Sequence, residues 1–194
     1  MRFLWSICVA CALAGPAFAE GPISTSEFDV SKLAASLPDR TLKALEKGPD
    51  YFVEEVAGLI LGYGGDEGID RKGLETAIQH GWAKARARAR SDLGEADLNA
   101  DGAITAGEAK IVGRTMSGWS RGRLMLRFRA ADLDLNETVS DRELESFAEV
   151  RALKALPNSQ ADAWRDLMLF DLNENGLLAL EEVLLAVKAF KGEV

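Results

Sequence analysis

Apolar residues recur every three to four positions through most of the chain after residue 32, which predicts amphipathic helices rather than strands. The clearest helical stripes are Trp164, Leu167, Met168 and Phe170, and then Val183, Ala186, Val187 and Phe190. Gly48-Pro49 breaks the pattern and separates predicted helices over 32–46 and 51–61. Pro157 is expected to end another helix, with Ser159 as the cap of the next one. The pattern predicts an all-α protein.

The first part of the chain, residues 1–19, has the pattern of a secretory signal peptide. Arg2 precedes an apolar run, and Ala17-Phe18-Ala19 supplies small residues for cleavage before Glu20. The run is too short to span a bilayer, so we expect no transmembrane segment. We therefore expect an exported protein, periplasmic or extracellular, with a flexible leader over residues 20–31; a lipidated start at Cys11 is the alternative.

Charge and composition narrow the classes of function. The chain of 194 residues has 31 acidic and 23 basic residues. Loss of Arg2 with the signal would leave 22 basic residues and a net charge of −9, which argues against a nucleic-acid binder. Cleavage would also remove Cys8 and Cys11, and with one histidine left most zinc sites are excluded. Stability must then come from the core or from another metal.

A repeated pattern of oxygen-bearing side chains occupies three segments, residues 97–108, 132–143 and 171–182. Each has Asp or Asn at positions 1, 3 and 5, an aliphatic residue at position 8 and Glu at position 12. Calcium takes about seven oxygen ligands in flexible geometry, including a backbone carbonyl at position 7. The expected ligand positions are Asp97, Asn99, Asp101, Ala103, Thr105 and Glu108; Asp132, Asp134, Asn136, Thr138, Ser140 and Glu143; and Asp171, Asn173, Asn175, Leu177 and Glu182.

This pattern resembles the calcium loop of the EF-hand family, D-x-[DN]-x-[DN]-G-x5-E, and the first and third segments match every position. The second departs at position 6, where Glu137 replaces glycine and is expected to adopt a positive φ at a cost of about 1–2 kcal/mol. The resemblance implies helix–loop–helix units paired in two lobes through short β-type contacts, and about three Ca²⁺ ions. Within this family the chain most resembles the compact four-unit calcium-binding proteins of the calerythrin and sarcoplasmic type.

A fourth, degenerate copy is expected at residues 62–73, because Ile69 lies 35 residues before Ile104. Gly62, Gly64 and Gly73 stand where the main side-chain ligands would be, so we expect the shape of the loop without the metal. We expect Ile69 to lie beside Ile104. The two pairs would then occupy residues 32–117 and 118–194, with a hinge near Gly113, Gly118 and Gly122.

The first and second loops each offer three carboxylates and the third offers two, and the strain at Glu137 weakens the second, so we predict that the first loop binds calcium most tightly, followed by the second or third. The function we expect is calcium binding as a calcium-stabilised module or buffer. A sensor is the alternative, with an opened lobe or the basic segments Lys84–Arg90 and Arg114–Arg129 binding a partner protein or an anionic membrane. A dockerin-like module is more distant, because Glu at position 12 and full entering helices argue against it. We expect no enzyme, since His80 has no catalytic partner at diagnostic spacing.

Overall fold

The computed structural model describes residues 30–192, which are mostly helical. The expected signal peptide, both cysteines and nearly all of the leader lie outside these residues. The elements in chain order are α1 (Val30–Ser36), α2 (Asp39–Lys47), α3 (Pro49–Tyr63), α4 (Arg71–Gly94), β1 (Ile104–Thr105), α5 (Ala106–Arg114), α6 (Gly118–Ala131), β2 (Thr138–Val139), α7 (Asp141–Ala155), α8 (Asn158–Arg165), the 3₁₀ helix η1 (Asp166–Phe170) and α9 (Leu180–Phe190). The all-α prediction is confirmed at this level.

Prolines set several of the helix boundaries. The predicted single helix over 32–46 is wrong, because Pro38 disfavours a helical conformation at Leu37 and divides the segment into α1 and α2. Pro49 lies in the first turn of α3, where backbone N–H groups have no partner within the helix, so the N–H that proline lacks costs no hydrogen bond. Pro157, and not the predicted Ser159, is the cap of α8. Among the helices between residues 30 and 192, none combines the length and hydropathy that crossing a bilayer requires.

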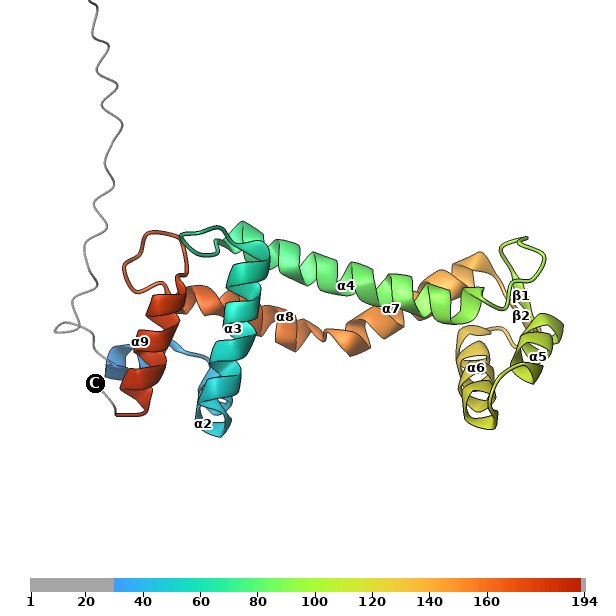
Figure 1. Cartoon of the computed structure of the whole chain (residues 1–194), viewed down its shortest axis with the longest axis horizontal. Helices are drawn as coiled ribbons and strands as arrows, with labels where there is room; N and C mark the ends of the chain where they lie inside the picture. The colour runs from blue at the N-terminus through green and yellow to red at the C-terminus, as the bar shows by residue number, and fades with distance from the viewer. Residues whose placement is uncertain (1–29, 193–194) are drawn as a thin grey trace, which may run out of the picture.

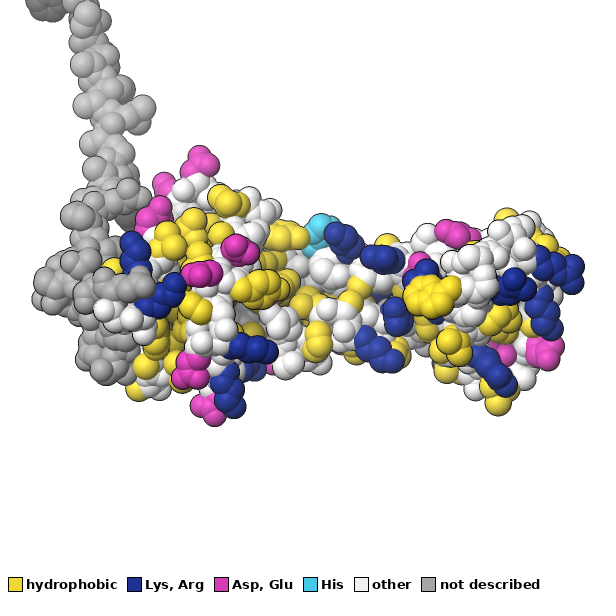
Figure 2. All heavy atoms as spheres, turned by 60° about the horizontal axis from the view of Figure 1, so that its bottom comes forward, with side chains coloured by type: hydrophobic (Ala, Val, Ile, Leu, Met, Phe, Trp, Pro, Cys, Tyr) yellow, Lys and Arg dark blue, Asp and Glu magenta, His cyan; other side chains and the backbone are white. Residues whose placement is uncertain are grey.

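The molecule is elongated, with a lobe at each end and a two-layered connection between them (Figure 1). Helix α4, 24 residues long and therefore about 36 Å, forms one layer of the connection. Helices α7 and α8 run alongside it and form the other (Figure 1). Arg86 of α4 pairs with Glu149 of α7 at 3.4 Å, and Arg90 pairs with Asp141 at 3.4 Å. A space-filling view shows the same narrow middle and wider ends (Figure 2).

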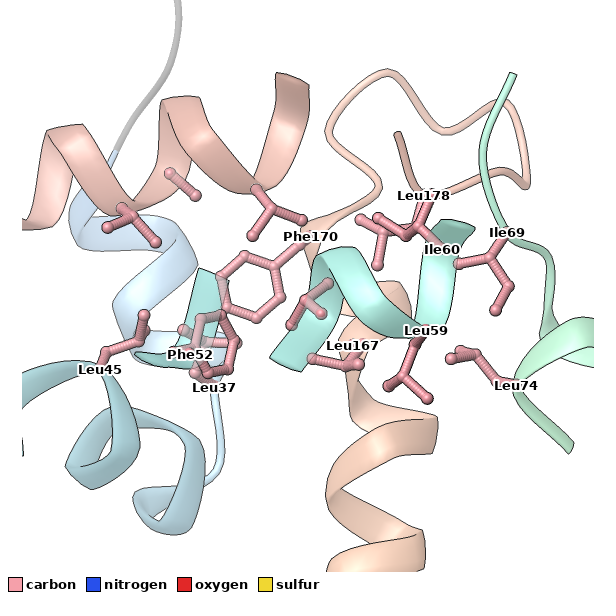
Figure 3. Packing of buried hydrophobic residues seen from close by; sticks show 14 of the residues in the cluster. Leu37, Leu45, Phe52, Leu59, Ile60, Ile69, Leu74, Leu167, Phe170 and Leu178 are labelled. Carbon is pink, nitrogen blue, oxygen red and sulfur yellow. The ribbon is translucent and has the colours of Figure 1, made fainter. Parts of the chain in front are cut away.

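The first lobe contains helices from both the beginning and the end of the described chain. Its core takes buried residues from α1, α2, α3 and the start of α4, together with residues of η1 and α9. The rings of Phe52 and Phe170 meet there with centroids 5.5 Å apart, and the aliphatic residues around Ile69 and Leu178 close the other side (Figure 3). The second lobe has a separate core, built between residues 89 and 148 from the end of α4 and from α5, α6 and α7.

The predicted division of the chain at residues 117 and 118 is therefore wrong. The chain leaves the first lobe through α4, builds the whole second lobe and returns through α7 and α8. The turn around Gly113 and Gly118 is also not a hinge between lobes, because it joins α5 to α6 inside the second lobe. Gly122 lies within α6.

The loops are paired differently from the prediction. Strands β1 and β2 are antiparallel, with Ile104 opposite Val139. Ile69 forms an isolated bridge with Leu178, in which each backbone N–H donates to the other residue's carbonyl at 3.0 and 2.8 Å. The expected contact between Ile69 and Ile104 is wrong, because the unbroken helix α4 holds these two residues at its opposite ends.

Candidate metal centre

The three repeated loops are closed by the same hydrogen bonds at their first residue. The carboxylates of Asp97, Asp132 and Asp171 each accept two backbone N–H groups from the same loop. One oxygen accepts from the residue at position 5, at 3.3, 3.1 and 3.2 Å in chain order. The other accepts from position 6, at 3.0, 3.1 and 2.8 Å. Each first-position carboxylate is therefore turned toward the inside of its loop.

The glutamate at position 12 closes each loop from the opposite end. Glu108, Glu143 and Glu182 lie in the first turns of α5, α7 and α9. One carboxylate oxygen accepts the N–H of the second loop residue, at 3.2, 2.9 and 2.9 Å. The other accepts the N–H of the ninth, at 2.9 Å in all three loops. These bonds bring the carboxylates of positions 1 and 12 to the same interior, which is the arrangement that a cation requires.

Side chains at positions 3 and 5 complete the ring of oxygens. Asn99, Asp134 and Asn173 accept the N–H of position 5 at 3.0, 3.1 and 3.0 Å. The side-chain oxygen at position 5 accepts the N–H of position 7 at 2.8 Å in every loop. Each loop thus surrounds its interior with carboxylate and amide oxygens, the hard donors that suit calcium and magnesium.

The backbone turns sharply at positions 4 and 6 of each loop. At position 6, φ is 84° for Gly102, 66° for Glu137 and 85° for Gly176, so the positive φ predicted for Glu137 is confirmed. Position 4 also has a positive φ, 57° at Ala100, 60° at Leu135 and 56° at Glu174. This second turn was not predicted from the sequence, because none of these three residues is a glycine or asparagine that would indicate it.

The second loop gathers its acidic side chains most closely. Ligand atoms of Asp132, Asp134 and Glu143 lie within 4.8 Å of one another, and no other acidic group of this kind occurs among residues 30–192. The first loop has its middle carboxylate at position 5 instead of 3, and in both loops this carboxylate accepts an asparagine amide, Asn99 to Asp101 at 2.7 Å and Asn136 to Asp134 at 2.9 Å. The gathering of acidic side chains therefore favours the second loop, whereas the backbone strain at Glu137 favours the first, since both loops offer three carboxylates.

The local environment also differs at the three glutamates. The Ser140 hydroxyl, followed by its backbone N–H, lowers the pKa of Glu143 to about 2. The backbone N–H of Thr105 and its hydroxyl lower the pKa of Glu108. Glu182 is completely buried, and this burial raises its pKa despite the three N–H groups that it accepts. A cation in the third loop would neutralise a carboxylate that is otherwise costly to bury.

The degenerate segment keeps only the second half of the repeat. Helix α3 continues through Tyr63, where the first loop residues would lie, and a tight turn then joins Gly65 to Gly68. A Cβ atom at Gly64 would lie 2.4 Å from the Gly68 carbonyl oxygen, and one at Gly73 would lie 2.7 Å from Ile69 Cγ1. Side-chain ligands at positions 3 and 12 therefore have no room, and the expected full loop shape is wrong for this segment.

The two basic segments are partly occupied by internal contacts. In Lys84–Arg90, the arginines at 86 and 90 pair with carboxylates of α7 and hold the connection together. In Arg114–Arg129, Arg127 pairs with Asp92 at 3.0 Å, and the Arg123 guanidinium lies 4.2 Å from the centroid of the exposed Trp119 ring.

The single histidine of the chain, His80, has a tyrosine as its neighbour: its Nδ1 lies 2.7 Å from the Tyr63 hydroxyl.

Comparisons with known proteins give no match, whether to protein-family models, to curated proteins or to solved structures. The class of protein must therefore be inferred from the loops themselves. Their shared feature is a set of three oxygen-lined helix–loop–helix segments with the same internal hydrogen bonds.

The positive φ of Glu137 leads to a prediction about stability. Glu137→Gly should stabilise the protein by about 1 kcal/mol, because relief of the left-handed strain exceeds the extra entropy that glycine gains in the unfolded chain. The carbonyl that accepts the Ala106 N–H is part of the backbone and is retained. Glu145→Gly, at an exposed position inside α7, should instead destabilise by about 1 kcal/mol. Urea unfolding of both variants measures the two values, and a loss of stability in Glu137→Gly would contradict the strain argument.

Proposed function

We propose that this protein is an EF-hand calcium-binding protein that holds about three Ca²⁺ ions in the loops 97–108, 132–143 and 171–182. The observation that carries the proposal is the common hydrogen-bond network, which directs the carboxylates of positions 1 and 12 inward in all three loops. Calcium fits these loops better than magnesium, because a twelve-residue loop with a bidentate glutamate supplies seven oxygens rather than a strict octahedron.

The arrangement of the loops supports the same family. Antiparallel contacts at position 8 join loops in couples, Ile104 with Val139 and Ile69 with Leu178. In this proposal the second lobe holds two ions on the β1–β2 pair. The first lobe holds one ion, in the loop 171–182, whose partner is the metal-free segment at 62–73. The second helix–loop–helix unit thus pairs with the third, and the first unit pairs with the fourth.

Burial favours calcium as a structural component over calcium as a transient signal. Asp132 is 5% exposed and Glu182 is fully buried, so two proposed ligands belong to the packed interior. An ion that neutralises such groups stabilises the folded state, because it binds the folded chain and not the unfolded one. Export, if the signal peptide is removed as expected, would place the protein in compartments where calcium can fill even weak sites.

The stoichiometry of calcium binding tests the proposal. Isothermal titration should give about three ions for the unmodified protein and about two for each of Glu108→Gln, Glu143→Gln and Glu182→Gln, because the twelfth residue supplies two of the seven oxygens. Glu145→Gln is the matched control, since it lies on the exposed surface of α7 two residues from Glu143, and it should keep three ions. Absence of calcium binding in the unmodified protein, or three ions in every variant, would overturn the proposal.

A further inference from the structure

A groove between α6 and α7 lies on the outside of the second lobe and has a volume of about 360 Å³. One wall is formed by Leu126 and Ala130 of α6 and by Leu133 just after the helix, and the other by Phe147, Val150 and Lys154 at helical spacing on α7. Leu126 is 71% exposed, Leu133 65% and Val150 51%. Exposed apolar side chains that line one continuous depression are typical of a binding surface rather than of scattered surface residues.

The charged residues that line this groove have one sign. Arg127, Arg151 and Lys154 line it, and no acidic residue does, although acids outnumber bases in the chain by 31 to 23. Arg127 already pairs with Asp92, whereas Arg151 and Lys154 are exposed at the rim. Basic and apolar side chains are visibly interleaved on the lobe that carries α5 and α6 (Figure 2). The groove is therefore complementary to a surface that is both apolar and acidic.

The apolar surface continues along α6 beyond the groove. Trp119, Arg123, Leu126 and Ala130 follow one another at intervals of three or four residues, so they share one exposed face of the helix. Within α6 the stripe from Trp119 to Ala130 is about 17 Å long, which is about three turns of helix. A recessed channel between two helices fits a partner helix better than it fits the flat surface of a membrane.

We propose that the α6–α7 groove docks an acidic amphipathic helix of a partner protein. The apolar side of that helix would fill the channel between Leu126 and Val150, and its carboxylates would meet Arg151 and Lys154 at the rim. The groove borders the loop 132–143, whose second residue is Leu133, but none of the residues that line it is a proposed oxygen ligand.

A designed peptide provides the probe, measured by fluorescence anisotropy with the whole protein. The peptide has about 18 residues, which as a helix spans about 27 Å, with Leu at intervals of three and four and with Glu, Gln and Ala elsewhere. Leu126→Glu, and separately Arg151→Glu with Lys154→Glu, should weaken its binding at least tenfold. Leu61→Glu is the matched control, because Leu61 is a 79% exposed leucine on α3 of the other lobe, and it should leave binding unchanged.

Circular dichroism should show that all variants are folded, since every substituted side chain is on the surface. The proposal would be overturned by equal binding of a sequence-scrambled peptide or of a peptide with Lys in place of Glu, by unchanged binding in Leu126→Glu, or by absence of binding. It would also be overturned if Leu126→Glu abolished adsorption to phosphatidylglycerol vesicles, or self-association in sedimentation, while the acidic peptide failed to bind. Those results would assign the groove to a membrane or to a second copy of the chain.

Discussion

Calcium at about a hundred times the dissociation constant of each loop should raise the midpoint of thermal unfolding by roughly 15–30 °C. An ion that binds only the folded state at this excess contributes about 2.7 kcal/mol, so three filled loops contribute about 8 kcal/mol. For a chain of 150–250 residues, each kcal/mol corresponds to about 2–4 °C. This is the largest effect that we expect from any change of solution conditions.

The physical cause is the concentration of acidic side chains at the proposed sites. Eight carboxylates occupy positions 1, 3, 5 or 12 of the three loops: Asp97, Asp101, Glu108, Asp132, Asp134, Glu143, Asp171 and Glu182. Backbone N–H groups hold these carboxylates in place, together with hydroxyl and amide groups of side chains in the first two loops. Two of the three loops lie in the second lobe, so calcium should stabilise this lobe about twice as much as the first.

Thermal unfolding followed by circular dichroism, in calcium and in excess chelator, measures this effect. Magnesium at the same concentration should shift the midpoint much less, because it gives up its water reluctantly and prefers a strict octahedron. The variant with Glu108→Gln, Glu143→Gln and Glu182→Gln is the decisive control. A calcium shift of full size in that variant would mean that the ions bind elsewhere on the surface.

Cysteine pairs at position 8 of the loops should cross-link only in the combinations that the structure shows. With Cys8 and Cys11 replaced by Ser, Ile69→Cys with Leu178→Cys should oxidise almost completely, and so should Ile104→Cys with Val139→Cys. Directly opposed residues of an antiparallel pair have Cα atoms about 4.5–5.5 Å apart, which is within the range of a disulfide. Ile69→Cys with Ile104→Cys should remain reduced, because α4 separates the two positions by about 36 Å.

Non-reducing electrophoresis and thiol titration after mild oxidation distinguish these outcomes. The first pair closes a loop of more than a hundred residues and the second closes a loop of 35, so both should change the mobility of the unfolded chain. Formation of the Ile69–Ile104 disulfide in monomeric protein would contradict the arrangement of the lobes. Each single-cysteine variant serves as the control for intermolecular cross-linking.

Short-range patterns in the sequence were enough to locate the loops and their inward-pointing side chains. The spacing of oxygen-bearing residues within twelve positions depends only on the local backbone, and the structure places Asp97, Asp132 and Asp171 in equivalent hydrogen bonds. The strain at Glu137 followed from one missing glycine in the same way. The turn at position 4 was missed because ordinary residues occupy it.

The partner of each loop could not be found from such patterns. Ile69, Ile104, Val139 and Leu178 are all aliphatic residues at position 8, so their chemistry allows any of them to pair. A helix over residues 71–94 was not among the predicted elements, and its consequence for loop pairing appears only in the tertiary structure. An unbroken helix of this length carries the chain out of the first lobe before the next loop begins.

Local backbone geometry and ligand chemistry, which act over a few residues, therefore located several helices and the three oxygen-lined loops, and they showed that the segment 62–73 lacks side-chain ligands. Packing over the whole chain decided which loops meet, which carboxylates are buried and where an apolar groove stays open. This difference between local and tertiary features has a physical reason. Hydrogen bonds within a loop join residues that are neighbours in the sequence. The hydrophobic effect is non-directional, so any apolar residues that the connecting helices bring together can form a core. In this protein the rigid α4, running beside α7 and α8, makes that choice.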